Sequence, residues 1–267
     1  TDLMLHKNKS DWDRHFRTIY ENDPYDHLRS IMNDKKMYDH SMPWVSHVSV
    51  KSTDFGRAAE WRTEYRKPVI YDMVQYEGDI ILQWGRISAQ EMVNRMWRGI
   101  ANGAYVTHGE AYKDPKNEWM WWSTGGELRG KSPDRISFLK DIVKDLPAGL
   151  QPIGKNVAGL PGEFYLYYFD DAKTQSKTFE LPGYREYTVD LIDAWNQTIT
   201  PLDTTFGEAF ELQLPGTPYS AVRIQKKGLL FPEEPVTIHS NGTQFLNEMT
   251  VSLSHPRHSE IFYTLDG

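Results

Sequence analysis

The chain has 267 residues, of which 39% are apolar and 25% charged, a composition typical of a globular protein of about two domains. A net charge of −7 argues against nucleic-acid binding, and the absence of cysteine excludes disulfides and thiolate metal sites. No apolar run reaches the roughly 20 residues of a membrane helix, and no signal peptide, phosphate loop or metal-binding spacing is visible.

Residues 10–146 alternate between helical and extended patterns. Ser10, the pair Ser88 and Glu91, and Ser132-Pro133 are typical helix starts. The predicted helices cover residues 11–20, 54–65, 88–101 and 134–146. The predicted strands cover residues 27–32, 44–50, 68–72 and 104–107. This alternation predicts right-handed βα units and a parallel sheet of about four strands, either half of an eight-stranded barrel or an open sheet.

The predicted strand at residues 68–72 is central because polar and aromatic side chains follow it directly. Its apolar residues do not alternate with polar ones, so both of its faces are expected to be covered. The residues that follow are Asp72, Gln75, Tyr76 and Glu77. The next strand ends in a similar group, His108-Gly109-Glu110. Enzymes of the βα class hold their chemistry at this end of the strands, so one shared site is predicted; a core strand followed by a polar loop is the alternative.

After Pro147 the pattern changes to short, partly alternating runs separated by turns such as Pro182-Gly183. These runs predict an antiparallel sandwich or small barrel with strands at 164–169, 177–181, 187–192, 209–214 and 221–224. Three further strands are predicted at 236–238, 249–253 and 261–265. The predicted division is therefore a parallel-sheet domain over 1–147, a β-sandwich over 148–227 and a partial β module over 228–267. The Gly- and Pro-rich stretch 147–162 marks the first boundary.

Several segments, in order along the chain, together resemble one enzyme family. They lie at residues 68–72, 76–80, 84–85, 108–110, 121–123 and 192–198. They resemble bacterial multidomain glycoside hydrolases with a clan-A-like (β/α)8 barrel of the apiosidase-related type, followed by a β-sandwich. The resemblance covers roughly residues 1–226. Residues 262–267 resemble the start of a chitobiase-type C-terminal immunoglobulin-like module. The implied fold class is α/β plus all-β: the C-terminal half of a TIM barrel, an antiparallel β-sandwich and a truncated immunoglobulin-like module.

The resemblance also implies a reaction, which is hydrolysis of O-glycosidic bonds in plant or microbial saccharides by a retaining carboxylate pair. Residues 1–4 resemble the segment just beyond the family's acid/base, so that residue is expected upstream of this chain. The family's nucleophile is a Glu directly after the strand that ends here at Asp72, but this chain has Met73. A thioether cannot form a glycosyl ester or act as a base. Either Glu77 or Glu110 is catalytic, or the chain is inactive.

The candidate site residues follow from these strand ends and from the chain's nine Trp and fifteen Tyr. Glu77 and Glu110 are the predicted catalytic residues. The predicted substrate-binding residues are His47, Asp72, Tyr76, Trp84, His108, Trp121 and Trp122. Each has an alternative: Glu77 is then a loop carboxylate paired with Arg86 or Arg95, and His47 a buried structural histidine. The loop tryptophans, with Trp119, either stack on a sugar or pack between domains.

Three hypotheses remain open. The first is a glycoside hydrolase, and the second, which Met73 favours, is a carbohydrate-binding or structural module without catalysis. The third is a half-barrel that pairs with a copy of itself, because open sheet edges need cover. The expected partners are a carbohydrate and the N-terminal half of the barrel, in the same or a separate chain. No cofactor, metal, nucleic acid or membrane span is expected. The resemblance implies a secreted, periplasmic or cell-surface location, with the cytoplasm as the alternative.

Overall fold

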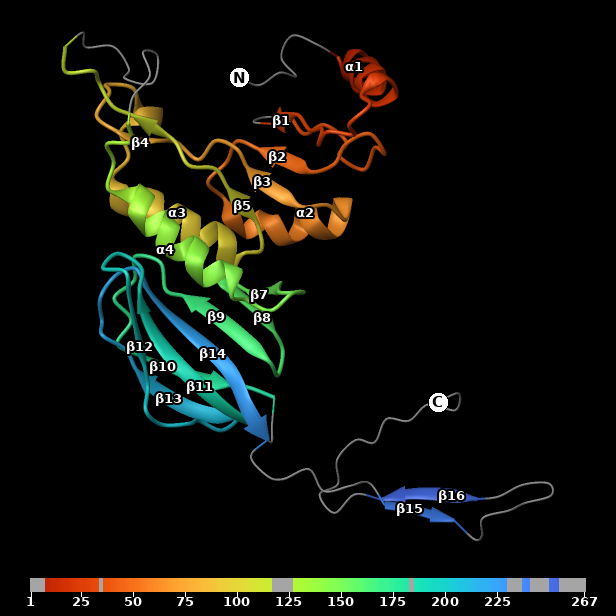
Figure 1. The fold of residues 1–267 in the computed structure, drawn as a ribbon, viewed down its shortest axis with the longest axis vertical. Coiled ribbons are helices and arrows are strands. Elements are labelled where there is room, and N and C mark those ends of the chain that lie inside the picture. Colours follow the sequence, from red (N-terminus) through yellow and green to blue (C-terminus); the bar gives the residue numbers. More distant parts are fainter. Residues whose placement is uncertain are drawn as a thin grey trace.

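The computed structural model describes residues 8–33, 36–116, 127–182, 185–229, 237–240 and 250–254. Helices α3 and α4 lie between a parallel sheet and a larger antiparallel sheet (Figure 1). The helices are α1 (Lys9–Asn22), α2 (Ala58–Tyr65), α3 (Ala89–Ala101) and α4 (Ser132–Lys144), with 3-10 turns at Phe55–Arg57 and Gln83–Gly85. The strands of the first part are β1 (Met32–Asn33), β2 (Val48–Val50), β3 (Val69–Tyr71), β4 (Glu77–Gly78), β5 (Tyr105–Val106) and β6 (Glu110–Ala111).

The parallel sheet has the strand order β1-β2-β3-β5, and all of its pairs are parallel. Buried side chains of β2 and β3, such as Val50 and Tyr71, pack against Phe55 and α2. Strands β1 and β2 are shorter than the strands predicted at 27–32 and 44–50, because residues 27–31 and 44–47 do not form regular strand pairs. The Arg29 amide donates to the Ser46 hydroxyl over 2.7 Å, while the Ser46 amide donates to the Arg29 carbonyl over 2.8 Å, so only one of these two bonds is a backbone bond.

Two predicted helix starts are wrong by one or two residues. Asn8, not Ser10, caps α1: its side chain accepts the Asp11 amide over 2.9 Å, and the Asp11 carboxylate accepts the Asn8 amide over 3.1 Å. Helix α4 starts at Ser132 itself, with Lys131 as its cap residue. In both helices the serine is of a residue type that often caps helices, but it lies in the first turn and not at the cap position.

Helix α3 starts and ends where the sequence predicts. The Ser88 hydroxyl accepts the Glu91 amide over 3.1 Å, and Gly103 follows the helix with a φ of +74°. Both are typical terminal signals, and the buried stripe of Met92, Met96 and Trp97 lies on one side between them. This helix is the central element of the packing, since it contacts the parallel sheet, α4 and the antiparallel sheet.

The antiparallel part is a six-stranded sheet with the order β12-β11-β14-β9-β8-β7 and a two-stranded sheet, β10-β13. Its strands are β7 (Gln151–Gly154), β8 (Val157–Leu160), β9 (Phe164–Tyr168), β10 (Ser176–Glu180), β11 (Arg185–Asp193), β12 (Thr198–Pro201), β13 (Ala209–Gln213) and β14 (Ser220–Leu229). The five predicted strands are all present. Residues 147–162, the predicted boundary stretch, contain the edge hairpin β7-β8. Its Pro152 is tolerated because β7 lies at the sheet edge.

Both faces of the six-stranded sheet are covered. Phe164, Leu166 and Tyr168 of β9 share one buried cluster with α3 and α4. The alternating residues Tyr165 and Tyr167 belong to a second cluster, under β10-β13. The parallel-sheet part and the antiparallel part are therefore joined by a continuous core.

Polar contacts fix the same junction. The Tyr168 hydroxyl donates to Asn94 Oδ1 over 2.8 Å. The guanidinium of Arg135 lies 3.8 Å from the ring of Trp195, and its Nε donates to the Trp195 carbonyl over 2.9 Å. Helix α4 is thus attached to the antiparallel part directly.

The last described strands, β15 (Thr237–Ser240) and β16 (Val251–Ser254), form an antiparallel pair in which Thr237 lies opposite Ser254. They correspond to two predicted strands, and the third, at 261–265, lies outside the described residues. Among the described residues, no helix has the length and apolar character needed to span a membrane.

Candidate functional site

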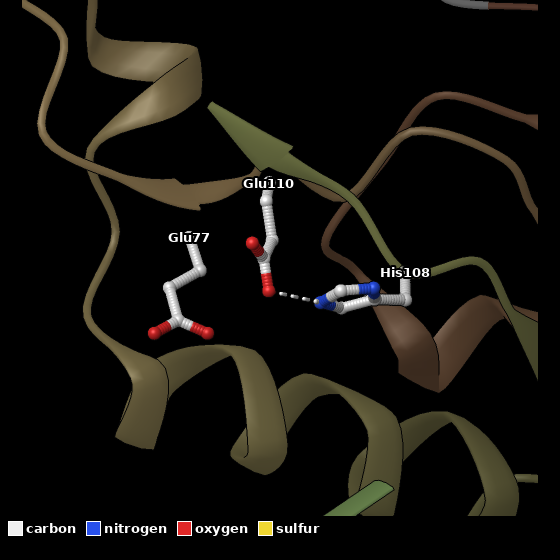
Figure 2. Close-up of side chains that lie close together, drawn as sticks. All are labelled: Glu77, His108 and Glu110. Atoms are coloured by element: carbon white, nitrogen blue, oxygen red, sulfur yellow. Dashed lines mark ion pairs between the residues drawn. The ribbon is translucent and has the colours of Figure 1, made fainter. Parts of the chain in front are cut away.

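Two short strands bring the predicted carboxylates together. Strand β4 pairs with β6 in parallel, and Glu77 lies directly opposite Glu110 (Figure 2). The neighbouring Gly78 permits this pairing, because a Cβ there would overlap the carbonyl group of Ala111 in β6. The two predicted catalytic residues therefore share one location, beyond the carboxyl ends of β3 and β5.

Glu77 is buried, with 2% of its surface exposed. Its Oε1 accepts the Tyr112 hydroxyl and the Lys131 amide, each over 2.8 Å, and its Oε2 accepts the Ser132 amide over 3.1 Å. Burial raises the pKa of this carboxyl, but hydrogen bonds from Ser132, Lys131 and Tyr112 outweigh it and lower the pKa. Arg95, an alternative partner expected from the sequence, pairs instead with Glu91 over 2.6 Å.

Glu110 is held in a similar way. Its Oε2 accepts the Arg129 amide over 2.8 Å, and its Oε1 accepts the Gly130 amide over 3.1 Å. A Cβ on Gly130 would lie 2.6 Å from Glu110 Oε1 and closer still to Glu77 Oε2. Only glycine lets the backbone pass between the two carboxylates.

His108 lies beside this pair. Its Nε2 is 3.1 Å from the Ser132 hydroxyl and 3.8 Å from Glu110 Oε1 (Figure 2). Burial lowers the pKa of the imidazole, although Glu110 and Glu77 act in the opposite direction. The lowered pKa favours the neutral ring at pH 7, in which one ring nitrogen donates a hydrogen bond and the other accepts one.

A hollow of about 720 Å³ opens at this edge of the sheet. Its wall is formed by residues that follow β2, β3 and β5, together with Trp84 and Leu128: Lys51, Met73, Tyr76, Trp84, His108, Gly109, Glu110 and Leu128. The rings of Tyr76 and Trp84 meet edge to face, with centroids 5.7 Å apart. A wall of this kind, mostly apolar with few polar groups, is typical of a small-molecule site.

Two of the remaining predicted site residues, His47 and Asp72, lie outside the wall of the hollow. His47 Nδ1 bonds the Ser46 hydroxyl over 2.8 Å, and Asp72 accepts the hydroxyl of Ser49. Trp119, Trp121 and Trp122 fall outside the described residues. A second hollow of about 760 Å³ lies at the amino ends of β3 and β5, beside Pro68 and Ala104, and none of the described site residues lines it.

The ligand atoms of Glu77, His108 and Glu110 all lie within 4.8 Å of one another, a donor set that a cation accepts. However, each of the four carboxylate oxygens already accepts a backbone N–H. The geometry therefore favours a carboxylate pair neutralised by amides over a metal centre, and the expected absence of a metal stays a prediction.

Sequence analysis missed the residues that hold the pair, which are Tyr112, Arg129, Gly130 and Lys131. One signal was present, because Ser132-Pro133 marks a helix start, and a helix start offers unpaired N–H groups to any nearby carboxylate. Nothing in the sequence places that helix start beside Glu77.

Residues 154–225 match a family described as a domain of unknown function, DUF5605. The comparison with curated protein sequences gave no significant match. Its structural neighbours are glycoside hydrolases.

One neighbour, from Bacteroides vulgatus ATCC 8482, is described as a "putative glycoside hydrolase"; it is 32% identical, with a TM-score of 0.74 over 82% of this chain and 49% of its own. A family 5 glycoside hydrolase from the same organism is 14% identical, with a TM-score of 0.61 over 82% and 59%. A further glycoside hydrolase is 12% identical, with a TM-score of 0.59 over 82% and 61%. The last two show likeness of fold alone. The chain spans about half the length of the first neighbour.

Proposed function

We propose that this chain is part of a glycoside hydrolase that cleaves O-glycosidic bonds in a polysaccharide or oligosaccharide, and that the hollow beside Trp84 receives a sugar ring. The supporting observation is the hollow's position. It lies at the carboxyl ends of parallel strands, where βα enzymes bind substrate, in a chain whose structural neighbours are glycoside hydrolases. In this proposal Tyr76 and Trp84 supply aromatic faces for the ring, and His108 forms a hydrogen bond with a sugar hydroxyl.

The four-stranded sheet then forms the C-terminal half of a (β/α)8 barrel, and the strands that complete it come from elsewhere. The edge strand β5 presents Tyr105 with 62% of its surface exposed, which is unusual for a sheet residue unless another element covers it. The proposed partner is the N-terminal half of the barrel, which also carries the acid/base. A second copy of this chain is the alternative, and light scattering of the purified chain distinguishes a monomer from a dimer.

A second function, sugar binding without hydrolysis, is favoured by Met73. This thioether stands on the wall of the hollow directly after β3. Among the described lining residues the sole carboxylate is Glu110, whose side chain is only 1% exposed. Retaining hydrolysis needs two carboxylates about 5–5.5 Å apart across the sugar. The described residues of the hollow supply no such pair.

The test combines binding and turnover. The 267-residue chain is screened on a glycan array, the best ligand is titrated by calorimetry, and aryl glycosides of the same sugar are assayed for release of the phenol. Trp84→Ala is expected to weaken binding about tenfold, as loss of one aromatic contact predicts. Tyr25→Ala, at an aromatic ring that is 80% exposed outside the hollow, is the control. Because the proposal places the acid/base on the N-terminal half of the barrel, the same assays are repeated with that half added. Turnover with both halves present supports the hydrolase, binding without turnover in either preparation supports the second function, and no binding in either refutes both.

A further inference from the structure

The backbone amides of residues 129–132 are divided in pairs between two carboxylates. Glu110 accepts the first two amides, over 2.8 and 3.1 Å, and Glu77 accepts the last two, over 2.8 and 3.1 Å. We call this arrangement of residues 129–132, Glu77 and Glu110 the amide clamp. Every carboxylate oxygen of the pair has a backbone donor within it.

The clamp lies at the start of α4. The first four N–H groups of a helix have no partner within it, and the aligned peptide dipoles leave a partial positive charge there. Glu77 meets both requirements, because it accepts the amides of Ser132, the first residue of α4, and of the cap residue Lys131, which makes no side-chain cap bond. The Arg129 and Gly130 amides that Glu110 accepts precede the helix. The same contacts shield the carboxylates: Glu77 is 2% exposed, and the Glu110 side chain is 1% exposed.

One residue of the clamp also reaches the hollow. Ser132 donates its amide to Glu77, and its hydroxyl lies 3.1 Å from Nε2 of His108. Ser132 is fully buried, so its hydroxyl has no alternative partner in solvent. Because His108 lines the hollow, the orientation of its ring depends on where the clamp holds Ser132.

We propose that Glu77 and Glu110 are positioning residues of the sugar site: they fix residues 129–132 and, through Ser132, the imidazole of His108. They do not act as nucleophile or proton donor, because each of their oxygens accepts a backbone amide and both side chains are almost fully buried. This inference rests on the proposed sugar site, and it assigns to the two glutamates a role different from the catalytic one that their position at strand ends predicts.

The first test is Glu77→Gln, which keeps the shape but directs an NH₂ group at one of the two amides. We expect the affinity for the sugar found on the array to fall about tenfold, the effect of one lost hydrogen bond to a charged acceptor. If the chain hydrolyses a glycoside, Glu77→Gln is expected to raise KM and to leave kcat nearly unchanged. Asp79→Asn is the matched control, because Asp79 is an exposed carboxylate two residues away that accepts the Lys113 amide over 2.7 Å. It is expected to change neither quantity.

The second test reads His108 directly and needs no sugar. In the ligand-free chain, the imidazole signals of His108, assigned with His108→Gln, are titrated by NMR. Glu77→Gln and Glu110→Gln are each expected to lower the pKa of His108, since both carboxylates now raise it. Ser132→Ala is expected to shift the same His108 signals while leaving the backbone amides of residues 129–132 in place. This variant replaces Glu77→Gln in the test if Glu77→Gln does not fold.

The outcomes separate the two proposals. If the His108 signals respond but the parent chain binds no sugar, the proposed function fails and the positioning of His108 stands. If the chain binds sugar and neither Glu77→Gln nor Ser132→Ala alters affinity or the His108 signals, the positioning role is overturned. It is also overturned if Glu77→Gln abolishes kcat without changing KM, because that split marks a group that acts on the reacting atoms.

Discussion

The ring of Tyr168 in β9 is stacked on the indole of Trp97 in α3, with centroids 5.3 Å apart and planes 23° apart. Both rings are buried and belong to the cluster shared by the two parts of the chain. The opposite face of the antiparallel sheet is covered by β10-β13. The segment that matches DUF5605 therefore packs as an outer layer on the helical part, and the central strands of its main sheet are covered on both faces.

Tyr168→Phe tests whether this junction stabilises the whole chain. The change keeps the stack but removes the hydroxyl that donates to the buried Asn94, which leaves Asn94 Oδ1 without that donor. We expect a loss of about 1–3 kcal/mol in the free energy of unfolding. Urea unfolding followed by tryptophan fluorescence and circular dichroism is expected to show one shared transition at a lower midpoint. Tyr25→Phe, at an exposed ring, is the control. Two separate transitions, with only one affected, would contradict a continuous core.

Gly130→Ala tests the close passage of the backbone between the carboxylates. The added methyl group would lie 2.6 Å from Glu110 Oε1 and nearer to Glu77 Oε2, so the clamp has to open. We expect a loss of about 1–3 kcal/mol, the usual effect of overpacking a buried site. Gly154→Ala is the matched control, because a Cβ there meets Val157 at an ordinary 3.5 Å. Equal stability of the two variants in thermal unfolding would show that residues 129–132 adjust freely.

The clamp also predicts how stability depends on pH. The pKa of Glu77 lies below its ordinary value of 4.5 in the folded chain. The unfolded chain then binds the proton more readily, so the contribution of Glu77 is complete above pH 4.5 and is lost as the pH falls through the lower, folded value. Urea midpoints measured from pH 7 to pH 3 are expected to fall more steeply in the parent chain than in Glu77→Gln. Parallel curves would mean that the carboxylate gains nothing from its amide donors.

Local sequence signals predicted much of the fold. Helix α3 has its cap at Ser88 and its terminal glycine at Gly103, because both signals act within one turn of the backbone. The strand ends that carry Glu77, His108 and Glu110 were predicted to share one site, and the structure places the three side chains together. In parallel strands the carboxyl ends meet at one edge, so this prediction needs only the strand order.

The environment of those side chains could not be predicted, because it depends on contacts distant in sequence. The Lys131 amide lies 54 residues from Glu77, and nothing near Glu77 in the sequence announces it. The hairpin β7-β8 was missed for a related reason. Its Pro152 and glycines are residue types typical of a linker. The segment forms strands because β8 pairs with β9 at the sheet edge. The roles predicted for His47 and Asp72 stay predictions.

A substitution at Met73 tests whether the hollow can support glycoside hydrolysis. It lies on the wall of the hollow, directly after β3, where the resemblance predicts a nucleophile. Met73→Glu places a carboxylate there. With a glycosyl fluoride of the sugar that the chain binds, its oxygen is expected to form a bond to the anomeric carbon while the C–F bond breaks. Fluoride leaves with the electron pair, so no proton donor is needed for this step.

The expected result is a covalent glycosyl ester, seen as an increase in intact mass by one glycosyl residue and mapped to position 73 by peptide analysis. Fluoride release should match it in amount. Met73→Gln, which has a similar shape but no nucleophilic oxygen, is expected to bind the sugar without an adduct. If Met73→Glu binds the sugar and forms no ester, position 73 does not face the anomeric carbon. The methionine would then be a wall residue, and the nucleophile would have to be sought outside the strand that ends at Asp72.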